Sequence, residues 1–196
     1  STHCISSAAS DVYKRQSLLG LIAVWLTVRQ NPWCWPIGLV MVVLYAWVFF
    51  QAKLYSNTLL QCVYAALQLY GWWHWTRGER PDERLQVSSL NLRQTASGLV
   101  LGVLGSAVLG LLMMSYTDAS APWQDATLCA FSLVAQLWMA KKRLQCWALW
   151  ILLDVLFVVL FIDQALYLTA ALYALFTLLA CHGWLTWRRE LAAARP

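Results

Sequence analysis

The chain is built of long apolar stretches separated by short polar or charged segments. Cutting the pattern at charges and turn residues leaves seven stretches, at about 17–28, 36–52, 58–76, 95–115, 125–140, 145–162 and 165–187. None of them alternates apolar and polar positions in the manner of a half-buried strand. The pattern therefore predicts an all-α membrane protein with seven transmembrane helices.

The first stretch is short for a bilayer core of ~30 Å, which needs ~20 helical residues. Its helix must therefore draw on part of residues 1–16, a polar, serine-rich segment without the apolar core of a signal peptide. We expect the remainder of residues 1–16 to be a flexible or non-native leader.

The composition agrees with a membrane location. Hydrophobic residues make up 61% of the 196 residues and charged residues 12%, against roughly 45–50% and 25% in soluble domains. Too little polar side chain is present to cover a surface that faces water. The composition excludes a soluble enzyme, a disordered chain and a nucleic-acid-binding domain, and it makes the lipid bilayer the expected surroundings.

The basic residues predict an orientation. With seven spans, 11 of the 14 Lys and Arg residues fall on the side of the C-terminus and 3 fall on the other side. The positive-inside rule then places the C-terminus in the cytoplasm and the N-terminus outside, which in a bacterial inner membrane is the periplasm.

The sequence contains an internal repeat with a shift of 112 residues. Residues 19–77 align without a gap on residues 131–189, and 15 of the 59 positions are identical. The matched pairs of rarer residues are Cys34 with Cys146, Trp35 with Trp147, Gly71 with Gly183, Trp72 with Trp184 and Trp75 with Trp187. Each copy holds three spans, and basic residues follow the first and third span in both copies. Both copies therefore face the same way, which requires one additional crossing between them.

The fourth span supplies this crossing. Its small residues form a stripe suited to close helix packing, with Gly98, Gly102, Ser106 and Gly110 at every fourth position. We expect a 3+1+3 architecture of parallel repeats, a construction found in transporters with the substrate site near the middle of the membrane. Its parts are a leader 1–16, a first repeat 17–77, a linker 78–125 with the connecting helix 95–115, a second repeat 126–189 and a cytoplasmic tail 190–196.

Polar residues near the middle of a span are candidates for an asymmetric site when their counterpart in the other copy is apolar. The four pairs are Asp154 with Val42, Gln136 with Val24, Gln68 with Ala180 and Thr177 with Ala65. A carboxylate at the bilayer centre costs ~2.5–3.5 kcal/mol on insertion scales, so Asp154 should face the bundle interior and have a partner. The structural alternative is a protonated Asp154 that bonds a neighbouring helix.

Aromatic and polar residues share one face of the third span, and the seventh span repeats the theme. We interpret Trp75 and Trp187, which lie close to basic residues, as anchors at the membrane interface. The candidate substrate-binding residues are Gln61, Tyr64, Gln68, Trp72, Gln136, Trp147, Asp154, Tyr173, Thr177 and Trp184.

Aromatic faces bind cations at ~0.5–2 kcal/mol per contact, and amides bond hydroxyl or carboxamide groups. The set favours a small, flat, cationic or polar heteroaromatic ligand.

The sequence carries no signature of catalysis, of a cofactor or of a metal site. It contains no C-x-x-C pair, no H-E-x-x-H, no G-x-S-x-G and no phosphate-binding G-x-x-x-x-G-K-[ST]. We expect a protein that is not an enzyme. The alternatives from other classes are an intramembrane enzyme, for which Asp154 lacks a second carboxylate at its depth, and a membrane receptor or structural protein without transport.

Two stretches resemble the PnuC family of bacterial vitamin transporters, whose best-known substrate is nicotinamide riboside. They read W-C-W-P-I-G … Y-G-W-W-H-W and W-A-L-W-I-L-L-D … G-W-L-T-W, and the resemblance covers about residues 18–189. It implies a SWEET-like fold, facilitated diffusion of the unphosphorylated vitamin and trapping by a separate cytoplasmic kinase. Thiamine, which relatives take up, is also flat and cationic, so both vitamins stay open. The resemblance further implies a homo-oligomer, expected as a trimer.

Overall fold

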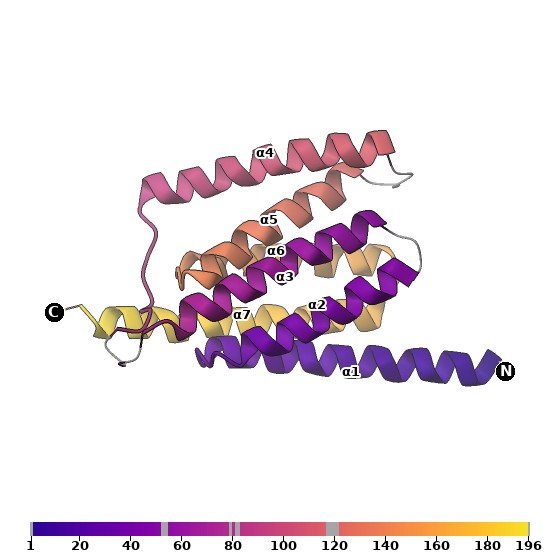
Figure 1. The fold of residues 1–196 in the computed structure, drawn as a ribbon, viewed down its shortest axis with the longest axis horizontal. Helices are drawn as coiled ribbons and strands as arrows, with labels where there is room; N and C mark the ends of the chain where they lie inside the picture. The colour runs from indigo at the N-terminus through magenta and orange to yellow at the C-terminus, as the bar shows by residue number, and fades with distance from the viewer. Residues whose placement is uncertain (1, 52–54, 79, 81–82, 117–121, 196) are drawn as a thin grey trace. The chain divides into compact units, whose positions relative to one another are not determined.

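A computed structural model describes residues 2–51, 55–78, 80, 83–116 and 122–195. These residues form seven α-helices and one isolated β-bridge (Figure 1). The helices are α1 (Thr2–Val28), α2 (Cys34–Gln51), α3 (Tyr55–Thr76), α4 (Leu92–Tyr116), α5 (Pro122–Ala140), α6 (Gln145–Asp163) and α7 (Tyr167–Ala193). The prediction of a seven-helix all-α protein is therefore confirmed. The predicted end of the second span at residue 52, Lys53, and the chain ends at residues 1 and 196 lie outside the described residues.

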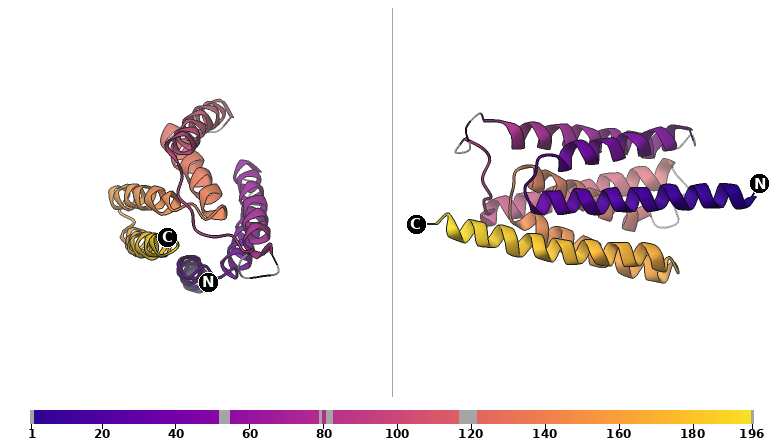
Figure 2. Two further views of the ribbon diagram at one scale, coloured as in Figure 1. Left: turned by 90° about the vertical axis from the view of Figure 1, so that its left-hand side faces the viewer. Right: turned by 90° about the horizontal axis from the view of Figure 1, so that it is seen from below.

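The helices belong to two compact units, Ser1–Thr76 and Arg77–Pro196. In the first unit α1 packs on α2, and α2 packs on α3. In the second unit α4 packs on α5, α5 on α6 and α6 on α7, and Figure 2 shows α6 and α7 side by side. Among the described helices, α4, α6 and α7 are each long and apolar enough to cross a membrane.

Helix α1 begins at Thr2, so residues 2–16 form its first part. The segment contains neither proline nor glycine, and therefore nothing in it interrupts the helix that the apolar part begins. The side-chain oxygen of Gln16 accepts a 3.0 Å hydrogen bond from the Tyr45 hydroxyl of α2. The polar segment thus lengthens α1, as the short apolar stretch required.

The same turn ends α1 and α5, the first helix of each predicted repeat. The amide of Gln30, with φ 55°, donates to the Thr27 carbonyl at 3.0 Å. The amide of Lys142, with φ 50°, donates to the Met139 carbonyl at 3.0 Å. The next residue in each turn donates to the carbonyl five residues back, at 2.8 and 2.9 Å. This pair of bonds is the Schellman motif, which ends a helix with a left-handed residue. The two turns lie 112 residues apart, which is the shift of the sequence repeat.

Equivalent tryptophan pairs join α2 to α3 and α6 to α7. The ring centroids of Trp35 and Trp75 lie 5.3 Å apart with 85° between the ring planes, and those of Trp147 and Trp187 lie 5.3 Å apart at 86°. All four rings are buried. The interpretation of Trp75 and Trp187 as interface anchors is therefore wrong, because edge-to-face packing buries both indoles of each pair between helices.

A glycine lets one indole of each pair reach the neighbouring backbone. A Cβ on Gly71 would lie 2.5 Å from the Trp35 ring, and a Cβ on Gly183 would lie 2.7 Å from the Trp147 ring. Both distances are far inside van der Waals contact, so any side chain at these positions would displace a buried ring. The indole–glycine contact therefore sets how closely the two helices of each pair approach.

The small-residue stripe of α4 packs against aromatic rings of α5. A Cβ on three of its glycines would lie 2.3–2.5 Å from one of these rings. The pairs are Gly98 with Trp138, Gly102 with Phe131 and Gly110 with Trp123. The prediction of close helix packing is confirmed, and Figure 1 shows α4 alongside α5.

The segment that precedes α4 is bound to the turn between α5 and α6. The Lys142 ammonium donates to the Leu85 carbonyl at 3.1 Å. The Ser88 amide donates to the Lys142 carbonyl at 3.0 Å, and the Ser88 carbonyl accepts from the Leu144 amide at 2.8 Å. The connecting helix is therefore held in the second unit both by its glycine face and by the segment before it.

We predict that Gly183→Ala lowers the stability of the folded protein by about 1–3 kcal/mol, because the new methyl overlaps the buried Trp147 ring. Thermal unfolding of the detergent-solubilised protein measures the change. Gly105→Ala is the matched control, since its Cβ would meet only the Ala130 Cβ at an ordinary 3.4 Å. Equal melting temperatures for both variants and the parent would contradict the role given to the indole–glycine contact.

Candidate substrate-binding site

Four buried polar side chains donate hydrogen bonds to backbone carbonyls. Thr27, Ser106 and Ser132 each donate to the carbonyl four residues earlier in their own helix, and Lys142 donates to Leu85. The three hydroxyls use their single donor in this way, so none of them needs a ligand to be satisfied, and the Lys142 ammonium has a protein partner.

Three other buried polar side chains, Gln68, Gln136 and Asp154, have no hydrogen-bond or ion-pair partner among the residues that the structure describes. They are 9%, 8% and 6% exposed; Gln68 and Asp154 lie near the middle of their helices, and Gln136 lies about one turn before the end of α5. Buried amides and carboxylates nearly always have a partner, so these three retain the capacity to bond a ligand or water. All three are positions at which the two sequence repeats differ.

In the first unit the candidate residues follow one face of α3. Gln61 and Tyr64 are half-buried and Trp72 is exposed. The Gln68 amide lies against α2, because a Cβ on Gly38 would be 2.6 Å from its Oε1 atom. Gly38 therefore makes room for the one buried amide on this face.

In the second unit Asp154 and Thr177 lie at one level of the α6–α7 pair. The Trp147 ring contacts Gly183; Asp154 follows Trp147 by seven residues, and Thr177 precedes Gly183 by six. At 1.5 Å per residue these offsets are about 10 and about 9 Å along two antiparallel helices. The Thr177 hydroxyl donates to the Tyr173 carbonyl at 2.8 Å, and its oxygen can still accept a bond.

A cluster of aromatic rings joins α6 and α7 about one turn beyond Asp154. The Tyr173 ring centroid lies 5.0 Å from that of Phe157, 5.1 Å from that of Phe161 and 5.4 Å from that of Phe176. All four rings are half-buried. A flat ligand bonded to Asp154 would therefore have planar side chains beside it.

The structure separates the remaining candidates into different surroundings. The Trp147 ring is 1% exposed and fills the contact with Trp187, so its packing role is evident. Trp184 is half-buried on α7, and Gln136 lies on α5. Within the second unit, Asp154, Thr177 and Tyr173 lie at neighbouring levels of the α6–α7 pair, whereas the candidates of α3 belong to the first unit.

Trp150 is a candidate that the sequence analysis missed. Its indole N–H is buried without a hydrogen-bond partner among the described residues, and it lies one helical turn before Asp154. Its counterpart in the other repeat is Gly38. The two copies therefore have the largest and the smallest residue at this position. Extending the comparison of repeats from polar to aromatic residues would have found it.

The chemistry of these residues is suited to binding. The site offers a carboxylate, amides, a hydroxyl and aromatic faces, which can neutralise a cation, bond polar substituents and stack on a ring. Among the described residues, no three His, Cys, Asp or Glu side chains lie together as a metal site would require.

Known proteins similar to this chain are transporters. A family model described as nicotinamide mononucleotide transporter matches residues 15–189. The nicotinamide riboside transporter PnuC of Escherichia coli (strain K12) is 27% identical over 202 residues, covering 89% of this chain and 84% of the relative. The riboflavin/roseoflavin transporter RibM of Streptomyces davaonensis is 26% identical over 181 residues, with the same two shares covered.

A solved structure has a similar fold. The crystal structure of the vitamin B3 transporter PnuC matches with a TM-score of 0.73 and 22% sequence identity, covering 92% of this chain and 81% of that chain. At this level of identity, the likeness establishes the fold alone.

We predict that Gln68→Met and Gln136→Met leave the melting temperature unchanged or raise it. Each replaces a buried amide that has no bond among the described residues with an apolar side chain of similar length. Lys142→Met is the contrasting variant, expected to cost about 1.5–3 kcal/mol because the Leu85 carbonyl loses a charged donor. Destabilisation by both glutamine variants to the extent seen for Lys142→Met would show that the amides serve the fold.

Proposed function

Since this chain belongs to the nicotinamide mononucleotide transporter family, we propose that it carries nicotinamide riboside across the inner membrane of a bacterium by facilitated diffusion. The chain is a multi-pass membrane protein of a transporter family. Nicotinamide riboside is what the name of the E. coli relative gives as its substrate.

The observation that carries the proposal is the set of three buried polar groups that have no partner among the residues described by the structure. Nicotinamide riboside has a pyridinium cation, a carboxamide and ribose hydroxyls. The Asp154 carboxylate would neutralise the cation, and the Gln68 and Gln136 amides would bond the carboxamide and hydroxyls. Indole and phenol rings would stack on the pyridinium ring.

The charge pattern favours the riboside over the phosphorylated mononucleotide. No Lys or Arg occurs in residues 30–52, 54–76, 94–140 or 144–187, which contain six of the seven predicted spans. A phosphate group deep in the membrane would need such a cation or a helix N-terminus as its partner. Phosphorylation by a separate cytoplasmic kinase would then trap the imported riboside and draw further substrate inward.

A second substrate class is another flat heteroaromatic vitamin. The riboflavin/roseoflavin transporter RibM is about as similar to this chain as the E. coli relative is, at 26% against 27% identity. Thiamine is the cationic member of this class. The carboxylate of Asp154 favours a cationic ligand over a neutral flavin.

We assign the substrate-binding role to nine of the ten candidate side chains and leave Trp147 to helix packing. The nine are Gln61, Tyr64, Gln68, Trp72, Gln136, Asp154, Tyr173, Thr177 and Trp184. The recurring Schellman turns and tryptophan–glycine contacts support a 3+1+3 architecture of parallel repeats. The excess of basic residues on one side supports a cytoplasmic C-terminus and a periplasmic N-terminus. The assembly proposed is a homotrimer.

Proteoliposomes that contain the protein should take up labelled nicotinamide riboside until the inner and outer concentrations are equal. A nicotinamide riboside kinase with ATP enclosed in the lumen should then raise the retained label above that level. Flux no greater than in empty liposomes would end the transporter proposal, and accumulation without the kinase would exclude facilitated diffusion. Competition by unlabelled thiamine, riboflavin and nicotinamide mononucleotide ranks the substrates in the same assay.

We expect Asp154→Asn to weaken equilibrium binding of nicotinamide riboside about tenfold or more, because a bond to a charged group contributes about 1.5–3 kcal/mol. Trp184→Ala should weaken it several-fold through loss of a stacking face. Isothermal titration of the folded variants measures both effects. Asp125→Asn and Trp33→Ala, at exposed positions outside the proposed site, are the matched controls. Unchanged affinity for Asp154→Asn and Trp184→Ala would remove both residues from the site.

A further inference from the structure

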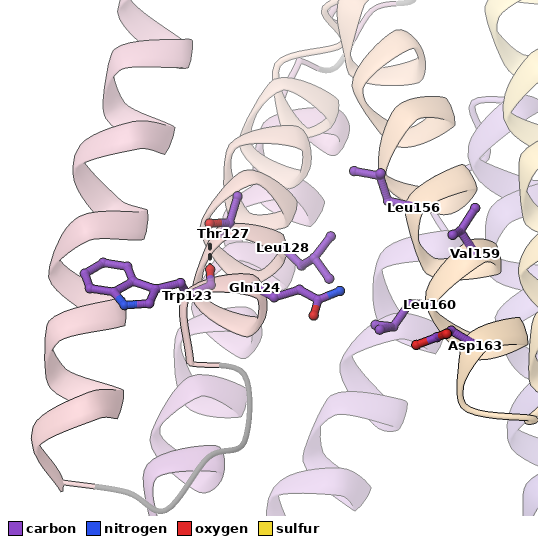
Figure 3. A pocket seen from close by; sticks show the side chains of 8 residues that line it. All are labelled: Trp123, Gln124, Thr127, Leu128, Leu156, Val159, Leu160 and Asp163. Atoms are coloured by element: carbon purple, nitrogen blue, oxygen red, sulfur yellow. Dashed lines mark hydrogen bonds between the residues drawn. The ribbon is translucent and has the colours of Figure 1, made fainter.

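A groove of about 540 Å³ lies between α5 and α6 in the second unit (Figure 3). Gln124 and Leu128 of α5 and Leu156, Leu160 and Asp163 of α6 point toward each other across it. These residues lie outside the substrate site described above. The groove is therefore a candidate binding surface separate from that site.

Polar and apolar groups are separated along the groove. Asp163 is the last residue of α6 and Gln124 is the third of α5, so both mark the end of a helix. Leu156 lies seven residues before Asp163, which is about 10 Å deeper along the helix axis. Half of a bilayer's hydrocarbon core is about 15 Å thick. The groove thus has the polarity profile of one membrane leaflet, with polar groups at headgroup level and leucines below.

The charge of the groove selects among lipids. Among the described residues, Asp163 is the one charged side chain that lines it. No Lys or Arg occurs in residues 94–140 or 144–187, the sequence that contains α5, α6 and most of α7. An anionic headgroup is usually bound by such cations and would be repelled by Asp163. A headgroup that carries an ammonium group complements this carboxylate.

We propose that the groove binds the upper part of a phospholipid with a primary-amine headgroup, such as phosphatidylethanolamine. The ammonium pairs with the Asp163 carboxylate, and the Gln124 amide donates to a phosphate or ester oxygen. An acyl chain lies along Leu128, Leu156 and Leu160. The proposal is independent of which substrate the protein transports.

The test is native mass spectrometry of the protein extracted from vesicles of equimolar phosphatidylethanolamine and phosphatidylglycerol. The parent protein should retain phosphatidylethanolamine in preference. Asp163→Asn should reduce the retained amount by up to about fivefold, the upper end of the range for an exposed charge pair. Leu156→Trp should fill the groove and reduce the retention of both lipids.

Two matched control variants test whether a loss of lipid retention is specific to the groove. Asp125→Asn removes an exposed carboxylate near the same end of α5 that does not line the groove. Val155→Trp enlarges the neighbour of Leu156, and these two side chains are 43% and 46% exposed. Both controls should retain phosphatidylethanolamine as the parent does. Equal retention in Asp163→Asn and Asp125→Asn, or a preference for phosphatidylglycerol, would overturn the proposal. So would a change of oligomeric mass in Leu156→Trp with lipid retention unchanged, because a second copy would then occupy the groove.

Discussion

The contact between an indole ring and a glycine backbone holds the second and third helices of each repeat together. In the membrane the hydrophobic effect does not drive helices toward each other, so they associate through close van der Waals packing. Trp147 against Gly183 and Trp35 against Gly71 provide that packing, and a second tryptophan closes each contact edge-on. The same device recurs on α4, where glycines receive the rings of α5.

A shared scaffold allows the two repeats to differ where function requires it. The two turns have hydrogen bonds of 3.0 and 2.8 Å in one unit and 3.0 and 2.9 Å in the other, with φ values of 55° and 50°. The tryptophan pairs have the same centroid distance of 5.3 Å and interplanar angles of 85° and 86°. One turn from these contacts the repeats diverge. The first has Gly38 beside Gln68, and the second has Trp150 and Ala180 at the equivalent positions. A ligand without internal symmetry needs such differences, and the packing around them keeps the helices in place.

Buried polar groups without partners are unfavourable for folding, and their retention points to function. Serine and threonine hydroxyls in this protein bond their own helix, which satisfies them locally. Gln68, Gln136 and Asp154 make no such bond among the described residues. Proteins commonly sacrifice stability at binding sites in this way, because a group that is satisfied internally cannot bond a substrate.

The sequence by itself determined the helices, their number and the repeat, because each depends on local hydrophobicity or on residues a fixed distance apart. It also singled out Gln68, Gln136, Asp154 and Thr177, since their counterparts are apolar. The structure then showed that Thr177 bonds the Tyr173 carbonyl, whereas the other three have no partner among the described residues. Tertiary structure alone decided which side chains are satisfied and which rings are buried. Trp75 and Trp187 resemble interface anchors in sequence, yet their partners lie on another helix. Lys142 resembles a solvated loop charge, yet it bonds Leu85 across 57 residues. Such contacts depend on how helices cross, which no local pattern records.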